Sequence, residues 1–367
     1  MILNNISILN YKNISEANLS FSDKVNCFTG RNGMGKTNLL DAIYYLSFCR
    51  SFISQPDAMV VRHDEDFLML QGKYSRRGET EEISCGIQLG KRKIVKRNGK
   101  EYKRLSMHIG LLPAVMVSPL DWDLIKGGSE ERRRLMDQII SQSNKEYLSE
   151  LIRYNKALEN RNSMLKQGVT DAILYDSVES VMSDSANYIH NVRTEWIKTF
   201  SPIFHDFYSR ISGGMEFVSL QYESHLNDAP MLQVLENNRR KDLAVGYTTA
   251  GVHRDDMELK LNGYSMRKIG SQGQCKTYTI ALRLAQYEFL RQNSGVKPLL
   301  LLDDIFDKLD SSRVGNIISV VSDSKFGQIF ITDTDRASFD EIIRHTGNGN
   351  YKIFTVHDGI CEEAGVL

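Results

Sequence analysis

The hydrophobic and polar positions of the first hundred residues follow two different periods. Short apolar runs at residues 2–9, 17–21 and 25–28 predict three strands. From residue 37 to residue 47, apolar side chains recur at the spacing of one helix face, which predicts a helix. Alternating residues between 67 and 103 predict β-hairpins, and Asn98-Gly99 is a typical two-residue hairpin turn. The chain therefore begins as an α/β structure.

The middle of the chain has a different character. From about residue 130 to residue 211 the apolar positions recur at helical spacing and turn residues are few. The α/β pattern returns after residue 246, with Asn262-Gly263 as a second hairpin turn. Apolar runs at 298–302, 328–331 and 351–356 predict the remaining strands. We expect a split α/β domain, residues 1–117 plus 246–367, with a mainly helical lobe at 118–245 inserted in it.

Charge and cysteine content limit the classes of partner. Lys+Arg and Asp+Glu are equal at 46 each, so a nucleic-acid surface would have to be a local patch. The five cysteines are scattered without a CxxC pair, which argues against structural zinc and fits a reducing cytosol. We find no signal-peptide pattern and no run of about 18 apolar residues. We therefore expect a cytoplasmic protein with no membrane partner.

A glycine-rich segment after the strand at 25–28 fits the pattern G-x-x-x-x-G-K-[ST] at every fixed position. Glycines let a loop turn its backbone N–H groups toward phosphate oxygens, and the helix that follows adds its dipole. Lys36 is expected to reach the β- and γ-phosphates of ATP, and Thr37 to bind Mg²⁺. The expected nucleotide-binding residues here are Gly30, Arg31, Asn32, Gly33, Met34, Gly35, Lys36, Thr37 and Asn38.

Two acids follow the apolar run that ends at Leu302. A buried parallel strand is an unbroken apolar run, and its carboxyl end would bring Asp303 and Asp304 beside the phosphate loop. Asp303 is expected to hold Mg²⁺, and Asp304 to orient or deprotonate the attacking water. Many ATPases of this type carry Glu at the second position, so the shorter Asp304 suggests slow hydrolysis. Lys36, Asp303 and Asp304 are the candidate catalytic residues.

A third motif precedes the helical stretch 276–291 and is similar to the ABC-type signature, Ser-Gly-Gly-Gln. It consists of Ser271, Gln272, Gly273 and Gln274. As a signature it would form a second cradle for the γ-phosphate of an ATP held by a partner subunit. As an ordinary helix start, Ser271 would only cap the helix. The strand at 328–331 ends where such enzymes carry a γ-phosphate switch residue, and either Thr332 or Asp333 stands there.

Three basic runs, and one turn that carries both positive and negative side chains, each allow two interpretations. The runs are Arg132-Arg133-Arg134, Arg239-Arg240-Lys241 and the Lys and Arg residues between 91 and 100, which flank the Asn98-Gly99 turn. Each fits a solvated face or a phosphate-binding surface. The segment His253-Arg254-Asp255-Asp256 has no second His at ligand spacing, so an ion-paired turn is favoured over a metal site.

Six segments together resemble the RecF family, whose members are SMC-like heads of the ABC superfamily, and the resemblance extends over essentially the whole chain. They are Tyr11-Lys12-Asn13, GRNGMGKTNLLDAIYYLSFCRSF from Gly30, SPLDWDLIKGGSEERRRLMD from Ser118, TTAGVHRDDM from Thr248, SQGQCK from Ser271 and LLLLDDIFDKLD from Leu299. Cys275 and Leu120-Asp121-Trp122 depart from the usual pattern without touching a phosphate-binding position.

The resemblance implies an ABC-type P-loop ATPase head with an inserted helical lobe. It further implies ATP and Mg²⁺ as ligands, an ATP-dependent homodimer, and weak, DNA-stimulated hydrolysis. The DNA would be duplex at single-strand gap junctions, with RecR as partner and with RecO and RecA as functional partners in RecA loading. Another SMC-like head acting on DNA is the alternative, and a P-loop small-molecule kinase, a transporter ATPase subunit or a scaffold with a vestigial ATP site fits the motifs less well.

Overall fold

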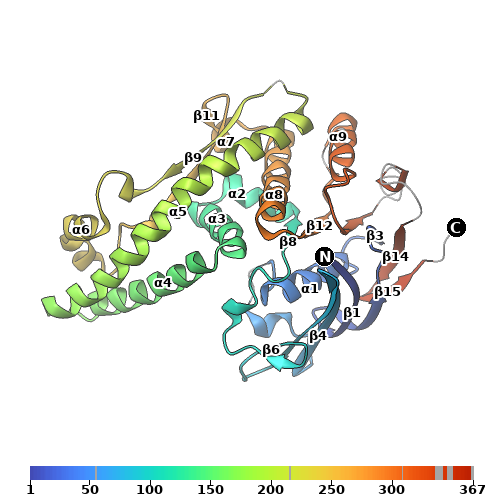
Figure 1. Ribbon diagram of the computed structural model, residues 1–367, viewed down its shortest axis with the longest axis horizontal. Coiled ribbons are helices and arrows are strands. Elements are labelled where there is room, and N and C mark those ends of the chain that lie inside the picture. The colour runs from blue at the N-terminus through green and yellow to red at the C-terminus, as the bar shows by residue number, and fades with distance from the viewer. Residues whose placement is uncertain (54–55, 215, 308, 335–341, 345–349, 365–367) are drawn as a thin grey trace. The chain divides into compact units, whose positions relative to one another are not determined.

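The computed structural model describes residues 1–53, 56–214, 216–307, 309–334, 342–344 and 350–364. The chain forms two compact units (Figure 1). The first unit contains Met1–Asp121, Phe207–Gly214 and Gln272–Leu367, and the second contains Trp122–Asp206 and Met215–Ser271. Among the described residues, no helix combines the length and apolar character that a membrane crossing needs.

A six-stranded sheet at the centre of the first unit has the order β15-β14-β3-β13-β12-β8. Its strands are β3 (Val25–Thr29), β8 (Ala114–Val117), β12 (Leu299–Asp303), β13 (Ile329–Asp333), β14 (Tyr351–His357) and β15 (Ile360–Glu363). All pairs are parallel except β14 with β15. β12 and β13 are buried along their whole length, as expected for apolar strands inside a parallel sheet. This confirms the predicted strands at 25–28, 298–302, 328–331 and 351–356.

The second sheet of the first unit is antiparallel, in the order β2-β1-β4-β5-β6-β7. Its strands are β1 (Ile2–Tyr11), β2 (Ile14–Ser20), β4 (Phe67–Arg76), β5 (Glu79–Gln88), β6 (Ile94–Arg97) and β7 (Lys100–Glu101). Buried and exposed residues alternate along β4 and β5, so one face of the sheet belongs to the core. Asn98 and Gly99 have φ angles of 49° and 77°, which confirms the predicted hairpin turn.

The helices of the first unit are α1 (Lys36–Phe48), α8 (Gln272–Ser294) and α9 (Ser311–Val321), with short 3₁₀ turns at Asp57–Val60, Leu105–Met107 and Pro119–Asp121. Most of α1 is buried, since it lies in the core beside both sheets. The helices of the second unit are α2 (Trp122–Lys126), α3 (Ser129–Ser143), α4 (Lys145–Lys166), α6 (Met231–Val245), α7 (Met266–Ile269) and most of α5 (Ala172–Ser212). Two 3₁₀ turns, at His225–Asn227 and Val252–Arg254, also belong to it. Its sheet is β11-β10-β9, formed by Tyr264–Ser265, Asp256–Leu261 and Val218–Glu223.

The compact units do not follow the expected domain boundaries at 117/118 and 245/246. Residues 246–271 belong to the second unit, because β10 pairs with β9 over six residues in antiparallel register. The end of α5 belongs to the first unit, where Phe207 and Tyr208 pack against Phe326 and Tyr278. The predicted helical content of the lobe is confirmed by α3, α4 and α5. The strands β8, β9 and β15 and the helices α6 and α9 were not predicted.

Candidate functional site

The phosphate loop lies between the end of β3 and the start of α1, as the motif predicts. A Cβ on Gly30 would lie 2.3 Å from the carbonyl oxygen of Val356, so only glycine fits beside β14. Gly35 has a φ of 109°, and a Cβ there would lie 2.7 Å from the side-chain nitrogen of Asn13. Since α1 has no side-chain cap at its N-terminus, its first N–H groups are available to an anion.

Lys36 is folded back over its own loop. Its Nζ donates to the carbonyl oxygens of Gly30 at 2.5 Å and Arg31 at 3.0 Å. Burial lowers the pKa of Lys36, and in the described part of the chain no carboxylate lies within ion-pair distance of it. The ammonium is thus held inside the loop by neutral carbonyls, where phosphate oxygens would be stronger acceptors.

The order of the central strands brings the phosphate loop and the acids together. β13 lies between β3 and β12, and the three strands end at the same edge of the sheet. The Thr37 hydroxyl lies 2.9 Å and 3.0 Å from the two carboxylate oxygens of Asp303. Thr332, at the end of β13, donates to Asp303 Oδ1 at 2.8 Å. The structure therefore places Thr37, Asp303 and Thr332 in one hydrogen-bonded cluster.

Asp304 continues this cluster beyond the end of the strand. Its φ is 48°, and its backbone N–H donates to Thr332 Oγ1 at 3.1 Å. Burial raises the pKa of Asp303 and of Asp304, and the negative charge of Asp333 raises that of Asp304 further. Both candidate switch residues thus act on an acid, Thr332 on Asp303 and Asp333 on Asp304.

The cluster fits a hard divalent cation. Asp303 is 4% exposed, and in the described ranges its carboxylate has hydroxyl donors but no ion-pair partner. A buried carboxylate without a cation is costly, and oxygen ligands beside a phosphate site are what Mg²⁺ requires. Thr37 Oγ1 and Asp303 are the side chains that would hold it. Bound Mg²⁺ would neutralise charge on the phosphate oxygens.

The Ser271 motif lies at the start of a long helix. Ser271 directly precedes α8, and Ser271 and Gln272 are exposed. This position suits both a helix cap and a phosphate cradle. At Gly273, a Cβ would lie 2.9 Å from Nη1 of Arg313, a residue of α9. Nearby, Asp310 caps α9 by accepting from the N–H of Arg313 at 2.9 Å. Asp310 ends the segment Lys308-Leu309-Asp310, which follows the two acids at the position where ABC-type ATPases carry a D-loop, and Lys308 lies outside the described residues.

Asn13 supports the phosphate loop and Asp41 anchors α1 behind it, although the sequence assigned them no role. Asn13 donates to the Met34 carbonyl at 3.2 Å and accepts from the Asn38 side chain at 2.7 Å. Asp41, buried on α1, pairs with Lys12 at 2.6 Å. The only sequence signal for this support was the segment Tyr11-Lys12-Asn13, which the family resemblance had singled out.

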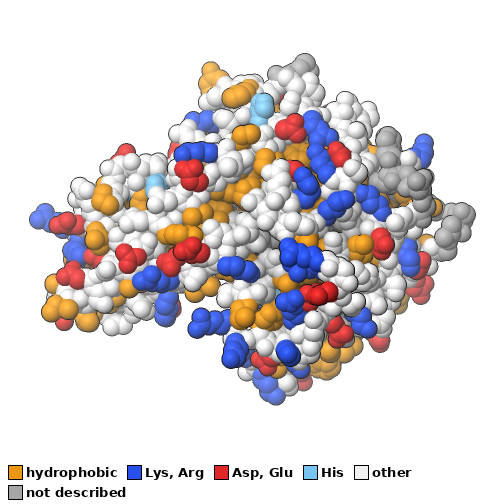
Figure 2. Space-filling view, in the orientation of Figure 1, with side chains coloured by type: hydrophobic (Ala, Val, Ile, Leu, Met, Phe, Trp, Pro, Cys, Tyr) orange, Lys and Arg blue, Asp and Glu red, His pale blue; other side chains and the backbone are white. Residues whose placement is uncertain are grey.

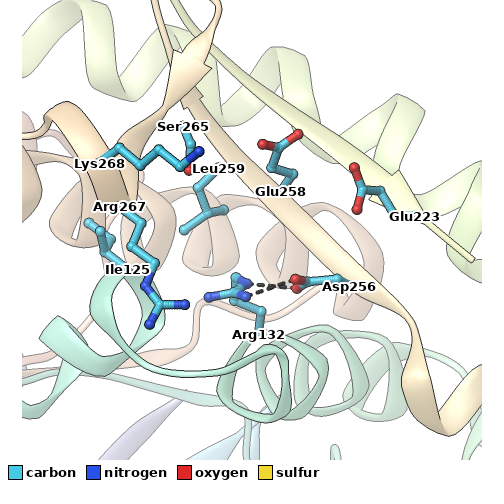
Figure 3. A pocket seen from close by; sticks show the side chains of 9 residues that line it. All are labelled: Ile125, Arg132, Glu223, Asp256, Glu258, Leu259, Ser265, Arg267 and Lys268. Atoms are coloured by element: carbon cyan, nitrogen blue, oxygen red, sulfur yellow. Dashed lines mark hydrogen bonds and ion pairs between the residues drawn. The ribbon is translucent and has the colours of Figure 1, made fainter. Parts of the chain in front are cut away.

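The turn at 253–256 is ion-paired, as predicted. Asp255 pairs with buried Arg193 at 2.6 Å, and Asp256 accepts two bonds from Arg132 at 2.7 and 2.8 Å. The second pair borders a pocket of about 300 Å³ in the second unit (Figure 3). His253 bonds to Tyr154 and to the Thr248 carbonyl. No group of three or more metal-ligating side chains occurs within the described ranges.

Comparisons with known proteins agree with this geometry. Residues 2–362 match the model of the RecF/RecN/SMC N terminal domain. The DNA replication and repair protein RecF of Parabacteroides distasonis is 51% identical, over 98% of each chain. A solved structure of the recombination mediator protein RecF-ATP in the RecFOR pathway has a TM-score of 0.88 at 30% identity, covering 99% of this chain and 98% of that one.

A Pyrococcus furiosus Smc head domain shares the fold, with a TM-score of 0.57 at 16% identity, covering 99% of this chain and 96% of that one. The expected α/β ABC-type head is thereby confirmed. The near-complete match to RecF relatives and the phosphate loop facing Asp303 show that the chain belongs to the RecF family of SMC-like, ABC-type ATPase heads.

Proposed function

We propose that this chain is an ATP-dependent DNA-binding protein of recombinational repair, which binds ATP and Mg²⁺, dimerises head to head and releases DNA after slow hydrolysis. The hydrogen-bonded contact between Thr37 and Asp303 carries the proposal, because it joins the phosphate loop to the acid that would share its cation. Residues 30–38 would hold the phosphates. The RecF relative of known structure is named as an ATP complex, which supports the same ligand here.

Hydrolysis would depend on Asp304. Its pKa is raised by burial and by Asp333, which makes it a better proton acceptor than an ordinary aspartate. Lys36 would leave its two loop carbonyls and pair with the γ-phosphate. The shorter side chain of Asp304, compared with Glu, would leave the water less well placed and keep turnover slow.

Dimerisation would require the Ser271 motif of one subunit to meet the ATP of the other. Exposed Ser271 and Gln272 at the start of a 23-residue helix can offer a hydroxyl and backbone N–H groups to a phosphate that is not their own subunit's. ATP would then lie between two identical heads and hold them together.

A basic surface around β6 is our proposed DNA contact. Lys93 and Arg97 are engaged, Lys93 with Asp57 at 2.7 Å and Arg97 with Glu81. The exposed cations that remain are Lys91, Arg92, Lys96, Lys100, Lys103 and Arg104. Figure 2 shows Lys and Arg side chains gathered over this part of the first unit. Such a surface suits phosphates and would bind duplex DNA by its backbone, at the edge of a single-strand gap.

The protein partners follow from the relatives alone. The solved RecF structures are assigned to the RecFOR pathway, which supports RecR as a direct partner and RecO as a functional one. We propose that the DNA-bound dimer, with RecR, promotes loading of RecA at the gap.

The proposal is tested by sedimentation and ATPase assays on the parent protein and on Lys36→Ala. The parent should become dimeric with ATP and Mg²⁺, and duplex DNA should raise its slow hydrolysis. Lys36→Ala should lose about 10- to 100-fold in ATP affinity, because the loop's cation is gone. An unchanged ATP affinity in Lys36→Ala, or a parent that neither binds nor hydrolyses ATP, would refute the proposed site.

A further inference from the structure

Arg313, at the start of α9, lies against the first turn of α8. Its Nη1 occupies the space that a side chain at position 273 would need, 2.9 Å from the Cβ position of Gly273. The same nitrogen donates to Thr277 Oγ1 at 3.3 Å, and Thr277 in turn donates to the Gly273 carbonyl at 2.9 Å. Because Gly273 has no side chain, the guanidinium group of Arg313 can lie directly against this turn of α8.

The position of this guanidinium is fixed by α9. Asp310 accepts from the backbone N–H of Arg313 and also lies 3.4 Å from its Nε. The Asp310 side chain is 60% exposed, so it screens the arginine only weakly, and the Arg313 side chain itself remains 21% exposed. An arginine held in this way has lost part of its conformational freedom before any ligand arrives.

Arg313 also keeps unused hydrogen-bonding capacity. A guanidinium has five N–H donors, and in the described part of the chain that of Arg313 makes one hydrogen bond and one ion pair. Buried Arg161 differs, since it bonds to Glu179, Asp242 and Thr248. Nη1 of Arg313 lies beside Gly273, the residue that follows exposed Gln272 at the end of α8 that carries the Ser271 motif.

We infer that Arg313 contacts the γ-phosphate of the ATP bound by the partner subunit and stabilises its negative charge during hydrolysis. The inference rests on the proposed head-to-head dimer and adds a residue to its ATP site. In the reaction, the oxygen of water bonds to the γ-phosphorus while the bond to the β–γ bridging oxygen breaks, and the water proton passes to Asp304. ADP and inorganic phosphate leave. Arg313 transfers no proton and supplies positive charge and two parallel N–H donors.

The first test compares Arg313→Ala with Arg291→Ala. Arg291 is the matched control, because it forms a similar i,i+3 pair, with Glu288 at 2.8 Å, in the last turns of α8. Arg313→Ala should bind ATP as a monomer like the parent, weaken ATP-dependent dimerisation about tenfold or more, and slow hydrolysis about 100-fold. Arg313→Lys should recover part of the dimerisation because the charge remains. Arg291→Ala should resemble the parent in all three measurements.

Mixed dimers decide between a role in the partner's site and a role in the arginine's own subunit. In a dimer of one Asp304→Asn and one Arg313→Ala subunit, one ATP site contains both changes and the other contains neither. At protein concentrations high enough to make both variants fully dimeric with ATP, equal mixing should therefore restore about a quarter of the parent ATPase rate, since half the dimers are then mixed and each has one intact site of two. An arginine acting on the ATP of its own subunit gives no restoration, because each ATP site of the mixed dimer then contains one of the two changes.

The outcomes separate this inference from the proposed dimer. A parent that does not dimerise on ATP refutes the proposed function itself, and the inference falls with it. A parent that dimerises while Arg313→Ala dimerises and hydrolyses equally well refutes only the role of Arg313. Absence of restoration in mixed dimers, with both variants folded by thermal melting, refutes action across the interface.

Discussion

The hydroxyl of Thr332 bonds to Asp303 at 2.8 Å as a donor and to the backbone N–H of Asp304 at 3.1 Å as an acceptor. One side chain at the end of β13 thereby fixes both acids at the end of β12. It also connects β13, which lies between β3 and β12, to both acids. A change at this hydroxyl should therefore affect stability and hydrolysis together.

We predict that Thr332→Val lowers the free energy of unfolding by about 1–3 kcal/mol at pH 7, because the ionised Asp303 loses a buried donor. The effect should shrink as the pH falls through the range in which Asp303 binds its proton, since a protonated carboxyl needs the donor less. Thr332→Ser keeps the hydroxyl and should resemble the parent in urea unfolding at both pH values. Equal unfolding of Thr332→Val and the parent at pH 7 would show that the bond contributes nothing.

The sequence was sufficient for the chemistry that depends on contiguous motifs. The phosphate loop, the strand ending at Asp303 and the Asn98-Gly99 turn were placed correctly, because each is defined by local backbone requirements. The bond from Thr332 to Asp303 could not be predicted in the same way. It depends on β13 lying between β3 and β12, and strand order is a property of the whole sheet.

The compact units differ from the predicted domain boundary for a related reason. Residues 256–261 looked like the start of the returning α/β domain, but their partner strand is β9, at 218–223. The alternation of polar and apolar residues can predict that a short segment forms a strand, but it does not predict which other strand that segment pairs with. The contact between Asn13 and the phosphate loop could not be predicted from local sequence either. Asn13 lies 17 residues before Gly30, and a single Asn does not form a motif by itself.

The basic surface around β6 leads to a prediction for DNA binding. The double variant Lys96→Ala/Lys100→Ala should lower duplex affinity, and the slope of log K against log salt should fall by about 2, because two phosphate contacts are lost. ATP binding should be unchanged. The matched control is Lys156→Ala/Lys198→Ala in the second unit, where both lysines are exposed and already pair with Glu159 and Glu195. Identical salt slopes for the two double variants would place the DNA contact elsewhere.

His253 predicts how stability depends on pH. Burial lowers the pKa of His253 to about 4, and its bonds to Thr248 and Tyr154 suit the neutral ring. The unfolded chain, with an ordinary histidine pKa, binds the proton more readily as the pH falls below about 6.5. Stability should therefore be full above that pH and should be about 2 kcal/mol lower at pH 5. His253→Gln should flatten this decline between pH 7 and pH 5 in urea unfolding, and an unchanged decline would assign it to other groups.

The central claim is that ATP joins two heads through the Ser271 motif, and sedimentation of Ser271→Arg with and without ATP tests it most directly. The variant should bind ATP as a monomer, since its own phosphate loop is residues 30–37 and is unchanged. It should fail to dimerise, because an arginine would block the partner's γ-phosphate from the start of α8. DNA retention should fall with dimerisation. If Ser271 were only a helix cap, the variant would lose about 1 kcal/mol of stability and assemble normally. A folded Ser271→Arg protein that still dimerises on ATP would contradict the head-to-head account.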